Sequence, residues 1–391
     1  MAAKKSAGKK SVKKVDYGAL ALAAHKRLHG KISVVSKAKL KERSDWSTYY
    51  TPGVAAVSSH LGKHPEDARI YSIKRNTVAV ISDGSAVLGL GNIGHYGALP
   101  VMEGKCVIFK EVADIDAFPI VLDTQDTEEI IKTIKHIAPV FGGINLEDIS
   151  APRCFEIEDR LKKELNIPVM HDDQHGTAIV VLAGLINAAK VVKKKIKDMK
   201  VVIVGAGAAG RAVALLMVKY GITDVIVTDS QGVIHKKREG ISGYKKELAG
   251  ATNPRGVKGV VFDAVSGADV IVGVSGPGTI TEAHIEVMAK DAIVFALANP
   301  TPEILPDLAK KAGARVIATG RSDFPNQINN ALVFPGIFRG ALDRGVNAIT
   351  DEMKVRAAEK IAGLVAKPTV EMTVPSVMDV RVVKAVASAV R

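Results

Sequence analysis

The stretch VVIVGAGAAGRAVALLM, at residues 201 to 217, decides the fold of the second half of this 391-residue chain. An apolar run typical of a buried strand leads into Gly205, Gly207 and Gly210, in the pattern GxGxxG, and then into an apolar helix. The glycines permit a tight turn and let a pyrophosphate approach the helix N-terminus, whose free N–H groups and dipole favour an anion. The stretch therefore predicts a strand, turn and helix that bind a dinucleotide.

An acidic residue downstream supports this prediction and bears on the choice of cofactor. Asp229 closes the next apolar run, 19 residues after Gly210, where the ribose hydroxyls of a dinucleotide would lie. Its charge repels a 2′-phosphate and so slightly favours NAD over NADP. A group of polar and basic residues nearby could nevertheless accept that phosphate, so the choice stays open; they are Ser230, Lys236, Lys237 and Arg238.

The rest of the second half repeats this alternation of strand and helix. Further apolar runs lie at residues 224 to 229, 269 to 274, 292 to 298 and 315 to 320, with helical patterns between them. The alternation predicts a Rossmann-like, doubly wound parallel sheet covered by helices on both faces. Ligands of such sheets bind at the carboxyl ends of the strands. The predicted cofactor contacts are therefore Gly205, Gly207, Ala208, Ala209, Gly210, Asp229, Ser275 and Asn299.

The first half mixes short helical patterns with apolar runs. Runs at residues 78 to 82, 106 to 110, 118 to 122 and 167 to 170 predict buried strands. Residues 152 to 165 predict an amphipathic helix, because Cys154, Ile157 and Leu161 recur at spacings of three and four. This half is therefore predicted to be a separate α/β domain.

A long apolar run marks the predicted domain boundary. Residues 178 to 192, opened by Gly176 and Thr177, are too many for one strand and predict a buried helix. We expect a substrate- and metal-binding domain at residues 17 to 176, and an NAD(P)-binding domain with C-terminal helices at residues 177 to 391.

Charge and composition exclude several other classes of protein. The net charge of +13 comes mainly from two lysine-rich runs, at residues 1 to 14 and 189 to 200, and only +2 remains elsewhere. That leaves little reason to expect nucleic-acid binding, which needs basic residues spread over one face. Residues 1 to 16 are predicted to be a basic, disordered tail.

The sequence also bears on the compartment of the protein. No run of about 18 uncharged apolar residues indicates a membrane span, and the first residues lack the apolar core of a signal peptide. Cys106 and Cys154 cannot form a disulfide framework and are typical of a reducing compartment. We therefore expect a cytoplasmic protein with no membrane partner.

Two acidic pairs predict a metal site in the first half. Glu147 and Asp148 follow one strand-like run, and Asp172 and Asp173 follow the next, with a helix between the two runs. A right-handed crossover would bring the two strand ends side by side. Carboxylates gathered in this way repel one another, and a hard divalent cation with oxygen ligands would neutralise them.

Two histidines near the second pair raise the alternative of zinc. His171 and His175 are four residues apart, but they are predicted to lie on a strand end and a loop rather than on one helical turn. We expect each of them to have a hydrogen-bonded structural role.

Eight motifs in order resemble the short form of malic enzyme, from Tyr17 to the C-terminus. Spacing alone indicates a metal-assisted, dinucleotide-dependent enzyme, and the substrate comes from the resemblance. The motifs are YTPGVA (50 to 55), VLGLGNIG (87 to 94), PVMEGKCVIFK (100 to 110), FGGINLEDI (141 to 149), HDDQHGTA (171 to 178), GAGAAG (205 to 210), FALANPTPEI (295 to 304) and TGRSDFPNQINNALVFPGIFRGAL (319 to 342).

The resemblance implies an N-terminal malic-type domain and a reaction. That reaction is the oxidative decarboxylation of (S)-malate to pyruvate and CO2 with reduction of NAD or NADP, assisted by Mg²⁺ or Mn²⁺, together with decarboxylation of oxaloacetate. We also expect a homodimer or a higher homo-oligomer. By the match, the metal ligands are Glu147, Asp148 and Asp173, the general base is Lys105 with Asp172 beside it, the general acid is Tyr50, and Asn299 and Asn329 contact the substrate or the nicotinamide.

The chemistry of malate oxidation explains these residue types. Hydride loss from C2 requires loss of the hydroxyl proton, which a divalent cation promotes as a Lewis acid. A neutral Lys105 could accept that proton, so its pKa must fall from about 10.4, as burial and a nearby cation would favour. Tyr50 would then protonate the carbon of the enol, directly or after receiving a proton from Lys105.

One departure from the family concerns the substrate carboxylate. Larger malic enzymes carry an arginine shortly before the LGLG segment, where residues 83 to 86 here read DGSA. The candidate replacements are backbone N–H groups of residues 89 to 94 and, more remotely, Arg321.

Two rival functions remain. One is a dehydrogenase or decarboxylase of another 2-hydroxy acid on the same scaffold. The other is a catalytically silent dinucleotide-binding regulator whose basic tail docks on an acidic partner. The presence of Lys105, Tyr50 and the carboxylates argues against a silent protein.

Overall fold

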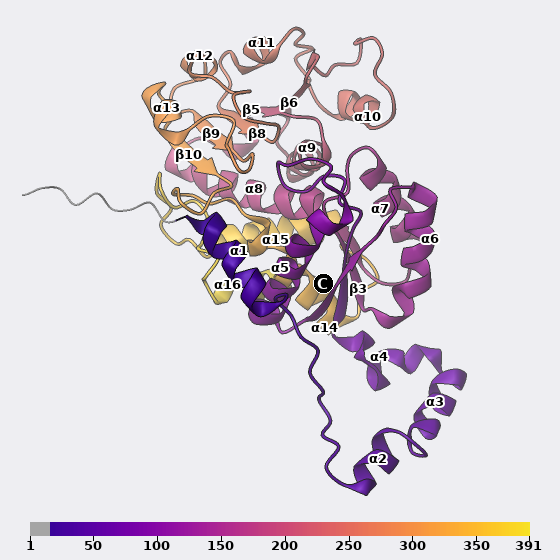
Figure 1. The fold of residues 1–391 in the computed structure, drawn as a ribbon. Helices are drawn as coiled ribbons and strands as arrows, with labels where there is room; N and C mark the ends of the chain where they lie inside the picture. The colour runs from indigo at the N-terminus through magenta and orange to yellow at the C-terminus, as the bar shows by residue number, and fades with distance from the viewer. Residues whose placement is uncertain (1–15) are drawn as a thin grey trace, which may run out of the picture.

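Two parallel sheets lie on either side of one long central helix, α8 (Asp172–Val191), as Figure 1 shows. The computed structural model describes residues 16 to 391, so the predicted basic tail lies, apart from Asp16, outside the described residues. The predicted class, mixed α/β with parallel sheets, is confirmed. Among the described residues, no helix is long and apolar enough to cross a membrane.

The first sheet has four parallel strands in the order β2-β1-β3-β4. The crossover from β3 through α7 to β4 brings two strand ends side by side, because Leu146 pairs with His171. The predicted strand, helix and strand are therefore adjacent. The elements are β1 (Thr77–Ser82), α5 (Gly94–Ala113), β2 (Asp116–Val121), α6 (Thr127–Ile137), β3 (Gly143–Leu146), α7 (Arg153–Glu164) and β4 (Val169–His171).

The second sheet has six strands in the order β10-β9-β8-β5-β6-β7. All are parallel except β7, an antiparallel edge strand that the sequence did not predict. The order reverses beside β5, so a crevice opens at the carboxyl ends of β5 and β8. The strands are β5 (Lys200–Val204), β6 (Asp224–Asp229), β7 (Gly232–Val233), β8 (Val270–Gly273), β9 (Ile293–Ala296) and β10 (Val316–Thr319).

Helices cover this second sheet, as the alternation of patterns predicts. The longest of them, α9, follows β5 directly and contains the last glycine of the GxGxxG pattern. The five helices between β5 and β10 are α9 (Ala208–Tyr220), α10 (Gly243–Ala251), α11 (Val261–Val265), α12 (Glu282–Glu286) and α13 (Pro306–Lys311).

One predicted strand is wrong. Residues 106 to 110 belong to α5, whose buried face carries Met102, Cys106, Phe109 and Ala113 at spacings of three and four. A short apolar run can come from a buried helix as easily as from a strand, and periodicity over five residues does not separate them. The predicted buried helix is confirmed, but α8 begins at Asp172, four residues before Gly176.

The C-terminal helices join the two halves of the molecule. Phe334 and Phe338 of α14 (Phe334–Arg344) pack against Phe109 of α5, with ring centroids 4.8 and 5.6 Å apart. Two more helices follow, α15 (Asp351–Gly363) and α16 (Arg381–Ala387). The predicted boundary at residues 176 and 177 thus falls inside α8, and the C-terminal helices do not serve the second sheet alone.

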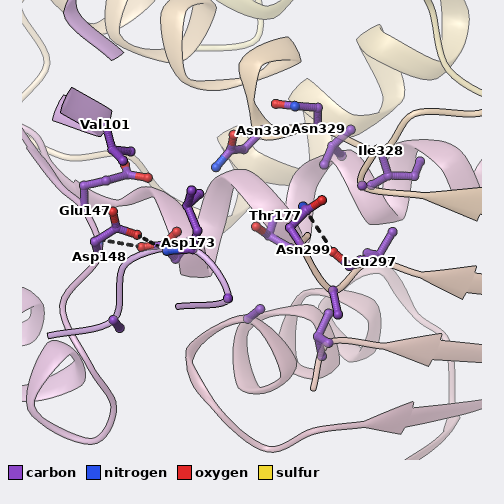
Figure 2. Close-up of a pocket in the computed structure, with 18 of the residues that line it drawn as sticks. Val101, Glu147, Asp148, Asp173, Thr177, Leu297, Asn299, Ile328, Asn329 and Asn330 are labelled. Atoms are coloured by element: carbon purple, nitrogen blue, oxygen red, sulfur yellow. Dashed lines mark hydrogen bonds between the residues drawn. The ribbon is translucent and has the colours of Figure 1, made fainter. Parts of the chain in front are cut away.

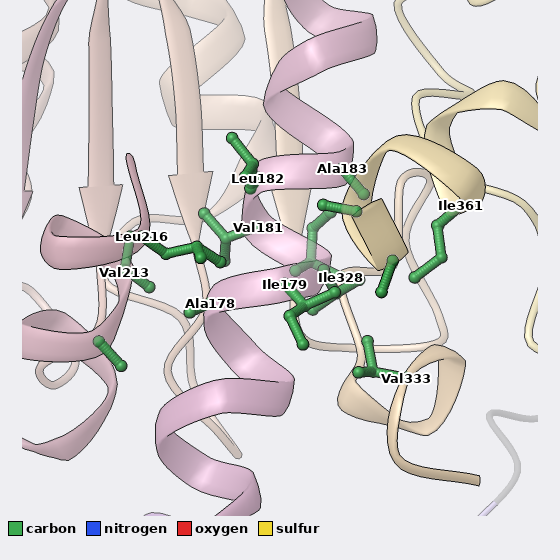
Figure 3. Packing of buried hydrophobic residues seen from close by; sticks show 14 of the residues in the cluster. Ala178, Ile179, Val181, Leu182, Ala183, Val213, Leu216, Ile328, Val333 and Ile361 are labelled. Carbon is green, nitrogen blue, oxygen red and sulfur yellow. The ribbon is translucent and has the colours of Figure 1, made fainter. Parts of the chain in front are cut away.

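Helix α8 is buried along most of its length. In Figure 3, Val181 faces Val213 and Leu216 of α9, while Ile179 lies beside Ile328 and Val333 on the opposite side. The two sheets therefore share one hydrophobic core through this helix.

The N-terminal arm, residues 16 to 76, differs from the rest of the protein. None of these residues is buried, and α2 and α3 project away from the body in Figure 1. The arm contains α1 (Tyr17–Leu28), α2 (Arg43–Tyr49), α3 (Val54–Lys63), α4 (Ala68–Tyr71) and the short helix η2 (Ile73–Arg75).

Candidate active site

A pocket of about 330 Å³ lies between the two sheets, where the strands of both end. This volume falls within the range of small-molecule sites. The first half contributes acids and a lysine, and the second half contributes amides and a hydroxyl, as Figure 2 shows in part. Of the predicted site residues, the lining includes Lys105, Glu147, Asp148, Asp173, Ala209, Ser275, Asn299 and Asn329.

Three carboxylates converge at one end of the pocket. Glu147 and Asp148 follow β3, and Asp173 lies in the first turn of α8, directly after β4. One carboxylate oxygen of each lies within 4.8 Å of the others. The Asp148 backbone N–H donates to Asp173 Oδ2 at 2.8 Å, which fixes the two strand ends relative to each other (Figure 2).

The electrostatics of this cluster fit a divalent cation. Burial and the neighbouring acids raise the pKa of Glu147 well above its ordinary value, and burial with the charge of Asp173 raises the pKa of Asp148 to about 8. Among the described residues, no hydrogen-bond donor meets the buried Asp148 Oδ2. Oxygen donors that repel one another and leave a buried acceptor unpaired suit Mg²⁺ or Mn²⁺ better than zinc.

Lys105 lies beside the cluster, on the buried face of α5. Its Nζ is 3.0 Å from Glu147 Oε1, forms an ion pair with Asp172, and lies 4.2 Å from the centre of the Phe334 ring. Burial acts to lower the pKa of Lys105, but the charges of Asp172 and Glu147 outweigh it and raise that pKa above the ordinary value. The predicted fall in this pKa is therefore wrong for the protein alone, because two carboxylates hold the ammonium form.

The glycine-rich turn has the geometry that a pyrophosphate requires. Gly205 has φ 118°, and a Cβ there would lie 2.6 Å from the Val274 carbonyl oxygen. A Cβ on Gly210 would lie 1.8 Å from the Gly205 carbonyl oxygen, whereas one on Gly207 would meet nothing within 4 Å. The first and last glycines thus allow close packing, and the middle one leaves space in front of the α9 N-terminus.

Asp229 ends β6 but is not a free carboxylate. Its Oδ2 accepts from Arg238 at 2.8 Å and from Lys245 at 2.6 Å, and its Oδ1 accepts the Gln231 backbone N–H at 2.9 Å. Burial opposes these partners, yet they hold the pKa of Asp229 below its ordinary value. The sequence indicated Arg238 as a nearby cation, but it gave no signal for Lys245, which comes from α10.

Other predicted residues lie outside the pocket. Tyr50 directly follows α2 on the arm and is 65% exposed. Arg321 binds Asp323 and the Pro300 carbonyl oxygen, and it does not line the pocket, whereas Gly89 of the other predicted carboxylate site does. The sequence did not single out Asn330, although it follows the predicted Asn329 directly.

His171 ends β4, as predicted, but neither of its buried ring nitrogens has a hydrogen-bond partner among the described residues, so the hydrogen-bonded role expected of its side chain is wrong. His175 lies in the first turns of α8 rather than on a loop. His175 Nε2 is 2.9 Å from Glu158 Oε2, so the predicted structural role of His175 is confirmed. The buried Glu158 also accepts the His171 backbone N–H at 3.0 Å and the Gln174 side-chain amide at 3.1 Å. Through these hydrogen bonds Glu158 stabilises the first turn of α8, which carries Asp172 and Asp173.

A dinucleotide turn and an acid cluster that face one pocket are typical of a dinucleotide-dependent oxidoreductase. Family models agree: "malic enzyme, N-terminal domain" matches residues 29 to 162, and "malic enzyme, NAD binding domain" matches residues 174 to 391. The chain belongs to the malic enzyme family.

Individual relatives resemble most of the chain. An NAD-dependent malic enzyme of Geobacillus stearothermophilus is 56% identical, over 92% of this chain and 76% of its own length. A bifunctional malic/malolactic enzyme of Bacillus subtilis is 51% identical, over 95% and 91%. The crystal structure of an NAD-dependent malic enzyme from Thermotoga maritima matches 96% of this chain and 99% of its own, at 47% identity and a TM-score of 0.92.

The acid cluster predicts stabilisation by a cation. Mg²⁺ or Mn²⁺ at about 100 times its Kd should stabilise the protein by about 2.7 kcal/mol, which thermal melting would detect. Asp173→Asn should abolish the metal-dependent rise in Tm, whereas Asp159→Asn, at an exposed position of α7, should keep it. Dinucleotide binding should survive both changes. An unchanged metal response in Asp173→Asn would exclude this cluster as the cation site.

The Glu158 network predicts a pH dependence of stability. Burial lowers the pKa of His175 to about 3, although Glu158 opposes this. Below about pH 6.5 the unfolded chain therefore binds a proton that the folded protein does not, and stability falls as pH falls. Glu158 acts in the same direction below its ordinary pKa, because its folded pKa is lowered.

Urea unfolding at about pH 7 and about pH 5 measures this effect, since the two values bracket the ordinary histidine pKa of about 6.5, at which the unfolded chain takes up the proton. The His175→Gln variant should lose less stability between them than the wild type. His136→Gln, at an exposed position of α6, should behave as the wild type. Equal losses in all three proteins would show that His175 is not held neutral.

Proposed function

We propose that the protein oxidatively decarboxylates (S)-malate to pyruvate and CO2 while it reduces NAD or NADP, and that it also decarboxylates oxaloacetate. The observation that carries this proposal is the single pocket in which Lys105 and three carboxylates face Ser275, Asn299 and Asn329. The family of the chain and the names of its relatives support the same reaction.

Each group of pocket residues has a separate role in the proposed reaction. When bound, a divalent cation held by Glu147, Asp148 and Asp173 supplies Lewis-acid polarisation of the substrate oxygens, and NAD(P) supplies the hydride acceptor. Lys105 Nζ takes the proton of the C2 hydroxyl, while Asp172 holds the amine in place. Asn299 and Asn329 orient the substrate and the nicotinamide.

The state of Lys105 depends on its acidic neighbours. It can accept a proton only once it is neutral, and in the protein alone Asp172 and Glu147 keep it charged. Neutralising the charge of Glu147 removes one of these two influences and so lowers the pKa of Lys105. Burial of the amine then acts in the same direction.

We also propose that the protein works in the cytoplasm. The two cysteines, Cys106 and Cys154, are buried and unpaired, as is typical of proteins in a reducing compartment.

The base is tested by replacing Lys105. Lys105→Ala should lower the rate of malate oxidation by about 10² to 10⁴, the usual loss for a positioned acid or base. Lys110→Ala is the matched control, because Lys110 lies on the same helix but is exposed and pairs with Asp114 and Asp116. Binding of NADH should persist in both variants. Turnover near the wild-type rate in Lys105→Ala would reject its role.

The cofactor preference follows from Asp229 and its two cations. We propose that NAD is used at least as well as NADP, because Asp229 lies where the ribose hydroxyls bind. Arg238 and Lys245 neutralise that carboxylate, so it repels a 2′-phosphate less than a free acid would. NADP is therefore a slower alternative rather than an excluded one.

Replacing Asp229 should reverse this preference. Asp229→Ser removes the carboxylate that pairs with Arg238 and Lys245, and it should raise kcat/KM for NADP relative to NAD by about tenfold, or about 1.4 kcal/mol. In the otherwise wild-type protein, Arg238→Ala should lower kcat/KM for NADP relative to NAD. Lys246→Ala, at an exposed neighbour of Lys245, should leave this ratio unchanged. A wild type that prefers NADP tenfold would overturn the assignment of Asp229.

A further inference from the structure

One buried carboxylate of the second sheet has no cation to neutralise it. Glu303 lies between β9 and α13 and is fully buried. Among the described residues, no lysine, arginine or histidine pairs with it, whereas the buried Glu158 pairs with Lys162 and His175. A buried charge is costly unless other polar groups compensate it, so Glu303 needs a different set of partners.

Backbone N–H groups at the ends of two strands are those partners. Glu303 Oε1 accepts the Ser275 N–H at 2.8 Å, and Glu303 Oε2 accepts the Ala298 N–H at 3.0 Å. Ser275 lies two residues beyond the end of β8, and Ala298 lies two residues beyond the end of β9. The carboxylate thus links the carboxyl ends of two neighbouring strands.

The last residue of β8 leaves room for this carboxylate. A Cβ on Gly273 would lie 2.6 Å from Glu303 Cδ and 2.9 Å from Glu303 Oε1. The three atoms nearest to that Cβ all belong to the Glu303 side chain. A larger residue at position 273 would therefore displace the carboxylate rather than the backbone.

The wall that Glu303 supports faces the pocket. Ser275 and Ala298 line the cavity, and so does Asn299, which lies on the side opposite the acid cluster in Figure 2. A dinucleotide lies across the carboxyl ends of such a sheet, and Asp229 on β6 is predicted to mark its adenosine end. Because β6 and β8 lie on opposite sides of β5, the nicotinamide end is expected at β8 and β9, in front of Glu303.

The charge of the cofactor at that end depends on its redox state. The nicotinamide ring is positively charged in NAD(P) and uncharged in NAD(P)H. A carboxylate just behind the pocket wall attracts the oxidised ring, and it does so more strongly there than in water. Burial raises the pKa of Glu303, whereas the two N–H donors act against that rise and favour the ionised form.

We infer that Glu303 is a positioning residue of the cofactor site with two effects. It fixes the ends of β8 and β9, which form the wall that receives the nicotinamide, and its charge favours the oxidised over the reduced cofactor. Glu303 does not itself line the pocket, so it acts through Ser275 and Ala298. The inference rests on the proposed function for the cofactor alone, because cofactor binding can be measured without malate.

Binding of the two redox forms to the full chain tests the effect of the charge. NADH is titrated by its fluorescence and NAD by its competition with NADH, or NADPH and NADP are used if the wild type binds them more tightly. Glu303→Gln keeps the size of the side chain and removes its charge, so the Kd of the oxidised form should rise about three- to tenfold more than that of the reduced form. Glu286→Gln, at an exposed position of α12, should leave both Kd values unchanged.

Gly273→Ala tests the positioning effect while the charge is kept. The added methyl group displaces the carboxylate from its two N–H donors, so both Kd values should rise by a common factor of about three or more. The ratio of the two Kd values should change less than it does in Glu303→Gln. The matched control is Gly250→Ala on α10, where a Cβ meets nothing within 4 Å, and it should bind both forms as the wild type does.

Thermal melting shows whether each variant is folded at the temperature of the titrations. Equal changes of the two Kd values in Glu303→Gln would overturn the effect of the charge. A folded Gly273→Ala protein with wild-type Kd values would overturn the positioning role, whether or not Glu303→Gln folds. Failure of the wild type to oxidise malate, with the expected Kd changes observed, would overturn the proposed function and leave the role of Glu303 standing.

Discussion

Lys105 Nζ lies 3.0 Å from Glu147 Oε1 and forms an ion pair with Asp172, and through these contacts it offsets part of the charge of four carboxylates at one edge of the first sheet. The rest of the site depends on this balance. The carboxylates lie close to one another because β3 and β4 end in register. They stay ionised only while a cation lies beside them. The amine pairs with Glu147 and Asp172, and Lys105, Glu147, Asp148 and Asp173 all line the cavity.

Features that depend on local spacing could be predicted from the sequence. The glycine turn at residues 205 to 210 and the helix between the two acidic pairs require only short-range periodicity and the handedness of a crossover. The strands of both sheets, except β7, followed from the same patterns. The strand predicted at residues 106 to 110 failed, because five apolar residues fit the buried face of α5 equally well.

What the sequence did not supply are contacts between distant segments. The pKa of Lys105 depends on Asp172, 67 residues away, and its direction follows from the balance between burial and charge. Asp229 is neutralised by Lys245 from another helix, and no spacing rule connects the two. The position of the arm is also non-local. The resemblance implied a role for Tyr50, but only the three-dimensional arrangement shows that this residue lies away from Lys105.

Helix α8 explains why an acid cluster and a dinucleotide turn on different sheets share one pocket. Its first turn carries Asp172 and Asp173. Further along, α8 packs against α9, whose N-terminus directly follows the glycine turn. A Cβ on Gly176 would lie 1.8 Å from Asp172 Oδ1, so the absence of a side chain there lets that carboxylate fold over the helix and reach Lys105. Because buried helices are close-packed, the spacing between the acid cluster and the glycine turn is set by a rigid element.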